Sequence, residues 1–285
     1  MSRAFTSVLN VERFATDVDG WRARFDAAVP FRHIVIDDFL TEPAAQAIHA
    51  EFPPLARAAR TAAWLLEARR YNVGTAHLGP SLRAVFSELG EAPFTHWLRT
   101  LTGVRDAQMD PENVGAGVHQ GARGSHLHVH ADHNTHPSDP TRYRRLNVLV
   151  YLNPHWVPAW GGELELWDAD CSHVVRTIEP RFNRCIIMEV HDRAFHGYRR
   201  LRFPADETRD SLAAYYYSDG PAALQAHAPH ATVFGVERDA GVPTRVASRI
   251  CQAVLARVFP RLQGLPLEVG KSLGQRNSAM RGDVR

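Results

Sequence analysis

Residues 124–134 read GSHLHVHADHN, and this stretch decides how we interpret the rest of the chain. Histidine alternates with apolar residues, and a period of two is typical of a strand in which residues i and i+2 share one face. His130 and Asp132 therefore project an imidazole and a carboxylate from the same face. The short pattern alone leaves two alternatives open: His126 or His128 as the ligand, or hydrogen-bonded histidines that bind no metal.

Histidines are concentrated in this part of the chain, because ten of the 16 fall between positions 119 and 196. Histidine is the commonest metal ligand. A third ligand is expected from His196, which follows the hydrophobic run at 185–188 and precedes a glycine. Two histidines and one carboxylate on one side of a metal, with the opposite positions open, are typical of non-haem Fe(II) oxygenases.

The surrounding sequence predicts a β-rich core. Between 114 and 218, short β-branched or alternating runs are separated by Gly, Pro, Asn and Asp. This texture predicts strands at 114–120, 125–132, 146–153, 163–167, 173–178, 184–190 and 212–218. Many short strands with no alternation of strand and helix favour a sandwich, barrel or jelly roll.

Helices are expected on both sides of this core. Apolar residues spaced by three and four predict one helix over 11–29, one that begins after Thr41 and stops at Pro53, one over 82–101 and one over 246–258. A strand is expected at 33–36, and the tail after 270 is polar. We expect one integrated domain, in which helical segments and an entry strand (1–110) and a C-terminal extension (221–285) flank the catalytic core (111–220).

Composition excludes several classes of protein. The net charge of +2 comes without a long basic run, so it gives no reason to expect nucleic acid as a partner. No apolar stretch reaches the roughly 18 residues that a membrane helix needs. Three widely spaced cysteines without a CxxC pair argue against a disulfide framework and a thiolate zinc site. These features predict a cytoplasmic protein.

Several motifs occur in a characteristic order: GSHLHVHADHN, RRLNVLVYLNPHW, WGGELELWD, EPRFNRCIIMEV, FHGY and TRDSLAAYYYS. This succession resembles the prolyl 4-hydroxylase-like group of the Fe(II)/2-oxoglutarate-dependent oxygenase superfamily. The resemblance covers roughly residues 112–219, and FRHIVIDDFL and FTHWLRTLTG resemble the family's entry segments. It implies a double-stranded β-helix, a cupin-like jelly roll, as an all-β core with helical flanks.

The resemblance also assigns roles to particular residues. It makes His130, Asp132 and His196 the iron ligands and places Arg209 at the distal carboxylate of 2-oxoglutarate. The chemistry agrees, because a guanidinium is permanently charged and grips a carboxylate through two parallel hydrogen bonds.

Further side chains are expected near the co-substrate. Tyr151 matches a family position whose phenol hydrogen-bonds the same carboxylate, whereas Asn147 and Gln120 lie on strands expected to line the cavity. Core packing remains an alternative for all three.

Other prominent residues receive no catalytic role. Gly161-Gly162 is expected to form a turn or bulge. Trp160 and Trp167 are interpreted as core or cavity wall, and Arg144 and Arg145 as exposed surface charge.

The implied activity is hydroxylation of an unactivated C–H bond, with release of succinate and CO2. The cofactors are Fe(II), 2-oxoglutarate and O2, with ascorbate as an optional stimulant. Asp132 favours hydroxylation over halogenation, because related halogenases lack the carboxylate. The first expectation for the substrate is a small, amino-acid-like metabolite. A prolyl or other residue of a protein is the second, and a sugar or natural-product intermediate is the third.

We expect neither nucleic acid nor a membrane as a partner, and a monomer or homodimer. Two rival interpretations remain. A non-catalytic metal-binding jelly-roll protein would have no chemical need for the complete set of four side chains. A cupin-type metal enzyme that does not use 2-oxoglutarate should lack an arginine directed into the cavity.

Overall fold

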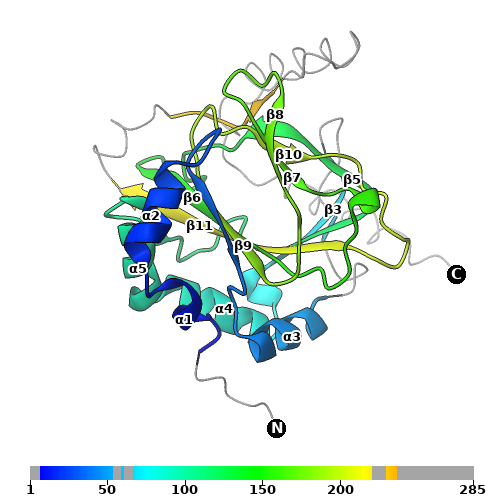
Figure 1. The fold of residues 1–285 in the computed structure, drawn as a ribbon, viewed down its shortest axis with the longest axis horizontal. Coiled ribbons are helices and arrows are strands. Elements are labelled where there is room, and N and C mark those ends of the chain that lie inside the picture. Colours follow the sequence, from blue (N-terminus) through cyan, green and yellow to red (C-terminus); the bar gives the residue numbers. More distant parts are fainter. Residues whose placement is uncertain (1–6, 54–58, 61–66, 220–228, 236–285) are drawn as a thin grey trace, which may run out of the picture.

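The computed structural model describes residues 7–53, 59–60, 67–219 and 229–235 (Figure 1). Its strands are β1 (His33–Asp37), β2 (Ala59–Arg60), β3 (Glu67–Gly74), β4 (Gln108–Met109), β5 (Gly117–Ala131), β6 (Arg142–Tyr151), β7 (Leu164–Trp167), β8 (Val174–Ile178), β9 (Arg184–Glu189), β10 (His196–Tyr198), β11 (Arg209–Asp219) and β12 (Val233–Phe234). They form one sheet with the main order β1-β9-β6-β11-β5-β10-β7-β8.

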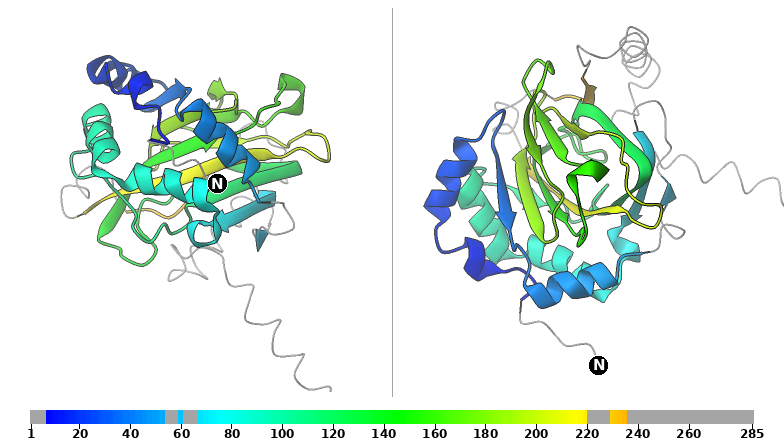
Figure 2. Two further views of the ribbon diagram at one scale, coloured as in Figure 1. Left: turned by 90° about the horizontal axis from the view of Figure 1, so that it is seen from below. Right: turned by 45° about the vertical axis from the view of Figure 1, so that its right-hand side comes forward.

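This antiparallel sheet curls into a barrel, which is seen most clearly in the right-hand view of Figure 2. An apolar cluster joins its two halves, because β6 and β9 contribute side chains on one side and β7 and β8 on the other. Its buried members are Phe31, Tyr151, Leu164, Leu166, Ile178, Ile186, Met188 and Ala194. This arrangement agrees with the predicted double-stranded β-helix.

Helices cover the other face of the sheet's larger half (Figures 1 and 2). They are α1 (Val11–Phe14), α2 (Val18–Asp26), α3 (Glu42–Ala50), α4 (Pro80–Gly90) and α5 (Ala92–Thr102). On β9, Cys185 and Ile187 face this helical layer, and the alternate Ile186 and Met188 face the barrel interior. Each fully buried large apolar side chain contributes about 1.5–3 kcal/mol. Both faces of β9 therefore stabilise the fold.

Two predicted helices are each divided into two, so their predicted extents were wrong. Between α1 and α2, Asp17 acts as an N-cap, because its side chain accepts a hydrogen bond from the Gly20 N–H at 3.0 Å. Between α4 and α5, Glu91 is extended and a proline stands in the first turn of α5. Helix α3 begins after Thr41 as predicted, although the Thr41 side chain makes no capping hydrogen bond.

The strand predictions needed several corrections. The strands predicted at 114–120 and 125–132 are one strand, β5, which continues through Gly121 and Gly124. Gly124 has a φ of +82°, so the glycines that were taken as a break bend the strand without ending it. Strands β2, β3, β4, β10 and β12 were missed. All of them except β3 have only two or three residues, which give no periodic signal. The predicted helix at 246–258 and Cys251 lie outside the described residues.

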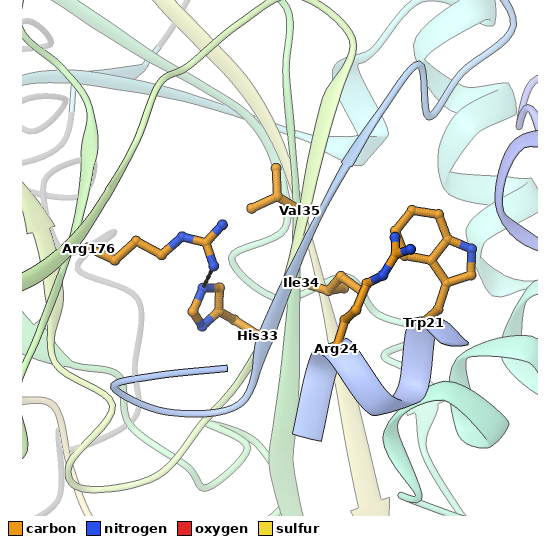
Figure 3. A pocket seen from close by; sticks show the side chains of 6 residues that line it. All are labelled: Trp21, Arg24, His33, Ile34, Val35 and Arg176. Carbon is orange, nitrogen blue, oxygen red and sulfur yellow. Dashed lines mark hydrogen bonds between the residues drawn. The ribbon is translucent and has the colours of Figure 1, made fainter. Parts of the chain in front are cut away.

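The two end strands of the main order, β1 and β8, approach each other at the open side of the barrel. The Arg176 guanidinium on β8 donates to Nε2 of His33 on β1 at 2.8 Å (Figure 3). A cavity of about 270 Å³ lies here, lined by Trp21, Arg24, His33, Ile34, Val35 and Arg176. None of the residues predicted to bind metal or co-substrate lines this cavity.

Strands from the predicted first segment are built into the same sheet as the core, because β1 pairs with β9 and β3 pairs with β5. The side chains of Cys171 and Cys185 are buried. Within the described part of the chain, every helix is too short or too polar to cross a bilayer.

Candidate active site

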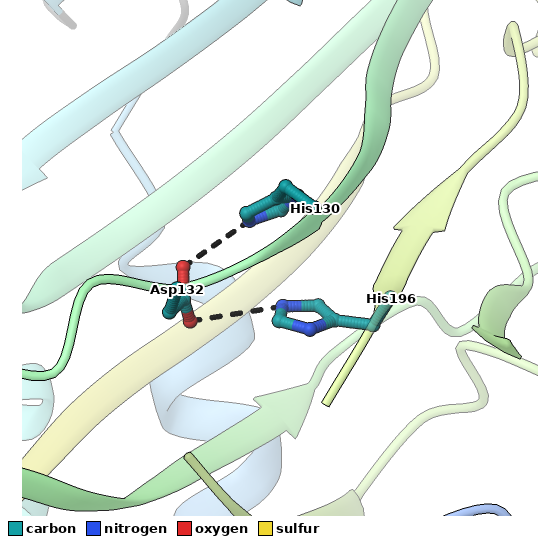
Figure 4. A group of neighbouring side chains, drawn as sticks. All are labelled: His130, Asp132 and His196. Carbon is teal, nitrogen blue, oxygen red and sulfur yellow. Dashed lines mark hydrogen bonds and ion pairs between the residues drawn. The ribbon is translucent and has the colours of Figure 1, made fainter. Parts of the chain in front are cut away.

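The three predicted metal ligands lie together at the end of β5 and the start of β10. His196 pairs with His130 across these strands, and Asp132 follows the last residue of β5. Nε2 of His130 lies 3.2 Å from one oxygen of Asp132, and Nε2 of His196 lies 3.7 Å from the other (Figure 4). All three ligand atoms lie within 4.8 Å of one another, which makes this the one such group among the described residues.

Both imidazoles are held in an orientation that suits metal binding. Nδ1 of His130 lies 2.9 Å from the backbone oxygen of His128, and Nδ1 of His196 lies 2.9 Å from that of Ala194. A carbonyl can only accept, so each Nδ1 carries the proton and each Nε2 offers a lone pair. Burial and the neighbouring His130 lower the pKa of His196 to about 4, so this ring is neutral at pH 7.

The carboxylate of Asp132 is ionised and held in place. Burial raises its pKa, but the neighbouring Arg144 guanidinium opposes this effect, and the pKa lies well below the usual value. One oxygen of Asp132 accepts from the Asn147 amide at 2.8 Å and from Arg144 at 3.2 Å. Arg144 in turn donates to Asn147 at 2.7 Å. Asn147 was expected beside the co-substrate, and its side chain instead supports Asp132.

Arg144 corrects the prediction of an exposed surface charge. Its side chain is only 4% exposed, and its guanidinium lies 3.5 Å from the centre of the Tyr215 ring. The reason is a β-bulge: Leu146 pairs with Tyr216, but Arg144 pairs with Tyr217, so Arg145 is an extra residue in β6. Strict alternation would direct Arg144 away from Asn147, and the bulge brings both to the same face.

A second polar group forms around Arg209, at the first position of β11. Its guanidinium donates to the Tyr151 hydroxyl at 2.8 Å and to the Gly162 backbone oxygen at 2.7 Å. The rings of Tyr151 and Tyr198 lie 4.7 and 4.3 Å from it. Burial raises the pKa of the Tyr151 phenol, which keeps it protonated. Arg209 and Tyr151, both expected at the distal carboxylate of 2-oxoglutarate, therefore contact each other. Tyr198 is an additional neighbour of Arg209 that was not expected from the sequence.

Gly162 has a structural reason to be glycine. Its φ is +90°, and a Cβ would lie 2.7 Å from Leu201 and 3.2 Å from Cδ of Arg209. The close approach lets the Gly162 carbonyl hold Arg209. The predicted turn is therefore also a contact of the candidate co-substrate site, and the GG pair was its only signal in the sequence.

Gln120 lies on the wrong face to serve this site. It pairs with Asp210, whereas Arg209 pairs with Gly121. Paired residues share a face and successive residues alternate, so Gln120 points away from Arg209. Its amide donates to the Asp210 carboxylate at 3.2 Å. The structure thus gives no support for Gln120 in the co-substrate pocket.

The donor set fits a first-row divalent metal. Nitrogen and oxygen ligands at roughly 2.0–2.2 Å from one ion, at right angles to each other, lie about 3 Å apart. The distances from the Asp132 oxygens to the two imidazole nitrogens are 3.2 and 3.7 Å, the first close to this value and the second longer. Two imidazoles and one carboxylate on one side are the donor set of non-haem Fe(II) oxygenases. His130, Asp132 and His196 are therefore the residues that could hold Fe(II).

Comparison with protein families supports the same interpretation. Residues 116–217 match the model of the 2OG-Fe(II) oxygenase superfamily. Over 83 residues the chain is 28% identical to prolyl 3-hydroxylase OGFOD1 of Mus musculus. These residues make up 28% of this chain. The match spans only 15% of the length of that curated relative.

Two solved structures have a similar fold. A Pseudomonas putida prolyl-4-hydroxylase superposes with a TM-score of 0.53 at 14% identity, over 71% of this chain and 100% of that chain. A Trichoplax adhaerens prolyl hydroxylase, in complex with a hypoxia inducible factor oxygen degradation domain peptide, superposes with a TM-score of 0.52 at 17% identity. This match covers 70% of this chain and 89% of that chain.

The family match confirms the resemblance to the 2OG-Fe(II) oxygenase superfamily over residues 116–217. The two solved structures confirm the double-stranded β-helix fold. At the level of the family these findings also support the predicted enzyme class, a 2-oxoglutarate-dependent dioxygenase, and its Fe(II), 2-oxoglutarate and O2.

Proposed function

We propose that this protein is an Fe(II)/2-oxoglutarate-dependent dioxygenase that hydroxylates a prolyl or other residue within a protein or peptide. One observation carries the proposal: the convergence of His130, Asp132 and His196 on one point, in the barrel that also holds Arg209 against Tyr151. The two histidines, Arg209 and Tyr151 are buried, and Asp132 is partly buried. All five residues lie within the segment that matches the oxygenase superfamily.

Each protein group has a definite task in this reaction. Fe(II), 2-oxoglutarate and O2 together supply the oxidation of a C–H bond to an alcohol, coupled to formation of succinate and CO2. His130, Asp132 and His196 would hold the metal. Arg144 and Asn147 hold the Asp132 carboxylate in its position through hydrogen bonds.

Arg209 would bind the distal carboxylate of 2-oxoglutarate. The Tyr151 hydroxyl accepts from Arg209, so its own proton is available for donation to the same carboxylate. Binding at this end orients the keto acid end towards the metal, and orientation of this kind lowers the barrier because the reacting groups are already in place.

The relatives favour a peptidyl substrate over the small metabolite expected first. The curated relative is a prolyl 3-hydroxylase, and the two similar structures are prolyl hydroxylases, one of them bound to a peptide. The matched segment of the curated relative supports the reaction class more strongly than the substrate. A peptidyl substrate is therefore the first choice for testing, and an amino-acid-like metabolite is the second.

Two measurements test the proposal. Aerobic incubation with Fe(II), 2-oxoglutarate, ascorbate and a library of proline-containing peptides should give succinate and a peptide that is one oxygen heavier by mass spectrometry. Oxygen-18 gas should label that product. Succinate formation stimulated by free amino acids but by no peptide would favour the metabolite.

The rival from another class, a non-catalytic metal-binding jelly-roll protein, makes the opposite prediction. It would bind divalent metal without forming succinate with any substrate. The hydrogen-bonded contact between Arg209 and Tyr151 weighs against it, because metal binding alone needs no buried cation elsewhere in the barrel.

A further inference from the structure

Arg209 is a buried cation whose position depends on few hydrogen bonds. It is 7% exposed, and among the described residues no carboxylate lies within ion-pair distance, 4.0 Å, of its guanidinium. The neighbouring Asp210 faces the other side of the sheet, towards Gln120. Burial of a charge without a partner costs free energy. Other groups must therefore stabilise Arg209 before an anion binds, and these groups also set the position in which Arg209 receives that anion.

We propose that Tyr198 is a positioning residue of the co-substrate site, and that its ring holds Arg209 for the distal carboxylate of 2-oxoglutarate. This inference rests on the proposed function. The Tyr198 ring lies 4.3 Å from the Arg209 guanidinium, closer than the 4.7 Å of Tyr151. A ring face attracts a guanidinium electrostatically, and the attraction is larger where water is excluded.

Strand β10 fixes Tyr198 in relation to the metal ligands. Tyr198 is two residues after His196, so the two side chains leave the strand on the same face. Gly197 between them allows a close approach to β5, because a Cβ there would lie 2.7 Å from the Leu127 backbone oxygen. The same three-residue strand thus supplies a metal ligand and a wall of the co-substrate site.

A hydrogen bond holds the far end of the ring. The Tyr198 hydroxyl lies 2.9 Å from Oγ of Ser125, and both residues are buried. Gly121, which pairs with Arg209, leaves space for Ser125, because a Cβ at Gly121 would lie 3.2 Å from Oγ of Ser125. Small residues on β5 therefore let the Ser125–Tyr198 pair lie directly beside Arg209.

Support through the ring leaves hydrogen-bond donors free for a ligand. A guanidinium has five N–H donors. One at Nε goes to Gly162 and one at Nη2 goes to Tyr151. The ring face of Tyr198 takes none, so three donors remain, including both at Nη1. Tyr198 thereby restrains Arg209 without competing with a carboxylate.

The test compares two keto acids on the Fe(II)-loaded protein without oxygen. 2-Oxoglutarate and pyruvate share the keto acid that chelates iron, but pyruvate lacks the distal carboxylate. The concentration that gives half of the visible charge-transfer band is measured for the wild type, Tyr198→Leu and Tyr198→Phe. Tyr198→Leu should raise this concentration for 2-oxoglutarate roughly tenfold and leave that for pyruvate unchanged. Tyr198→Phe keeps the ring and should change it by less than about threefold.

Tyr216→Leu is the matched control, because it also removes a buried tyrosine with a hydrogen-bonded hydroxyl, on the opposite face of the sheet. Tyr216→Leu should leave the half-saturating concentrations of both keto acids unchanged. If Tyr198→Leu weakens the binding of both keto acids equally, or of neither, the positioning role is overturned while the proposed function stands. If the wild type gives no band with 2-oxoglutarate, both fall.

A second route applies if Tyr198→Leu does not fold. Tyr198→Phe and Ser125→Ala each remove the same hydrogen bond. Their double mutant should therefore weaken the binding of 2-oxoglutarate no more than either single mutant does. Additive losses, or equal losses for pyruvate, would contradict the proposal.

Discussion

The two ends of the candidate site differ in how their charges are balanced. At the metal end, Asp132 is already paired with Arg144 and hydrogen-bonded to Asn147, so a network of side chains fixes one ligand. At the carboxylate end, Arg209 contacts a backbone oxygen, a neutral hydroxyl and two rings. The first end is organised to hold a cation through several ligands at once, and the second offers one uncompensated charge to an anion. Substitutions should therefore stop turnover at the metal end and change the requirement for co-substrate at the other.

The largest effect is expected from His196→Ala, which removes a metal ligand. Turnover should fall by more than about a hundredfold, since even the hydrogen-bond partners of ligands affect metal sites by 10–100-fold. The fold should persist, because other residues form the barrel core. Succinate formation and circular dichroism check both points. His128→Ala is the control, because His128 shares the strand and bonds the Gly235 oxygen. A loss as large for His128→Ala would point to a different ligand set.

Arg209→Ala should raise the 2-oxoglutarate concentration for half-maximal turnover by about a hundredfold. Each lost hydrogen bond to a charged group is worth roughly 1.5–3 kcal/mol. The rate at saturating co-substrate should change much less, because the metal end is intact. Steady-state kinetics with varied 2-oxoglutarate measure this, with the exposed Arg202→Ala as control. An unchanged requirement would remove Arg209 from the site.

Asn147→Ala sharpens the comparison from the metal end. The substitution removes a 2.8 Å hydrogen bond to Asp132 but keeps the ion pair with Arg144. Fe(II) affinity should fall about tenfold, with the affinity for 2-oxoglutarate at saturating metal nearly unchanged. Metal titration monitored by activity distinguishes the two quantities. A selective loss of 2-oxoglutarate affinity would instead restore the original expectation that Asn147 lines the co-substrate pocket.

The smallest effect is expected from Gln120→Leu. Gln120 bonds Asp210 on the far face of the sheet. The concentrations of metal and of 2-oxoglutarate needed for half-maximal turnover should both stay within about twofold of the wild type. The free energy of unfolding should fall by about 1 kcal/mol, because one hydrogen bond is lost. Kinetics and thermal denaturation measure the two. A selective change in the 2-oxoglutarate requirement would contradict the position of Gln120 on the face opposite Arg209.

Local periodicity predicted part of the site because some of its residues lie close together along the chain. His130 and Asp132 need only a locally extended chain to share a face, and β5 supplies it up to Ala131, the residue before Asp132. The motif order then led to His196 and Arg209. Residues that depend on irregular backbone were missed or misread: Arg144 turns inward only through the bulge at Arg145, and Gly162 touches Arg209 only after the chain has folded back.

Gln120 shows the opposite limit. A position on the correct strand says nothing about the face until the register with β11 is known, and that register is a long-range property. Helix breaks at Asp17 and Glu91 were overlooked for a related reason, because apolar spacing continued across residues whose backbone conformation ends a helix.

The most direct test of the account is a crystal structure of the protein with Mn(II) and 2-oxoglutarate, with the metal located by anomalous scattering. We predict one metal ion bound by Nε2 of His130, Nε2 of His196 and an oxygen of Asp132, with the distal carboxylate on Arg209 and Tyr151. A metal bound elsewhere, or 2-oxoglutarate that leaves Arg209 without a contact, would contradict the assignment of these side chains to an oxygenase active site.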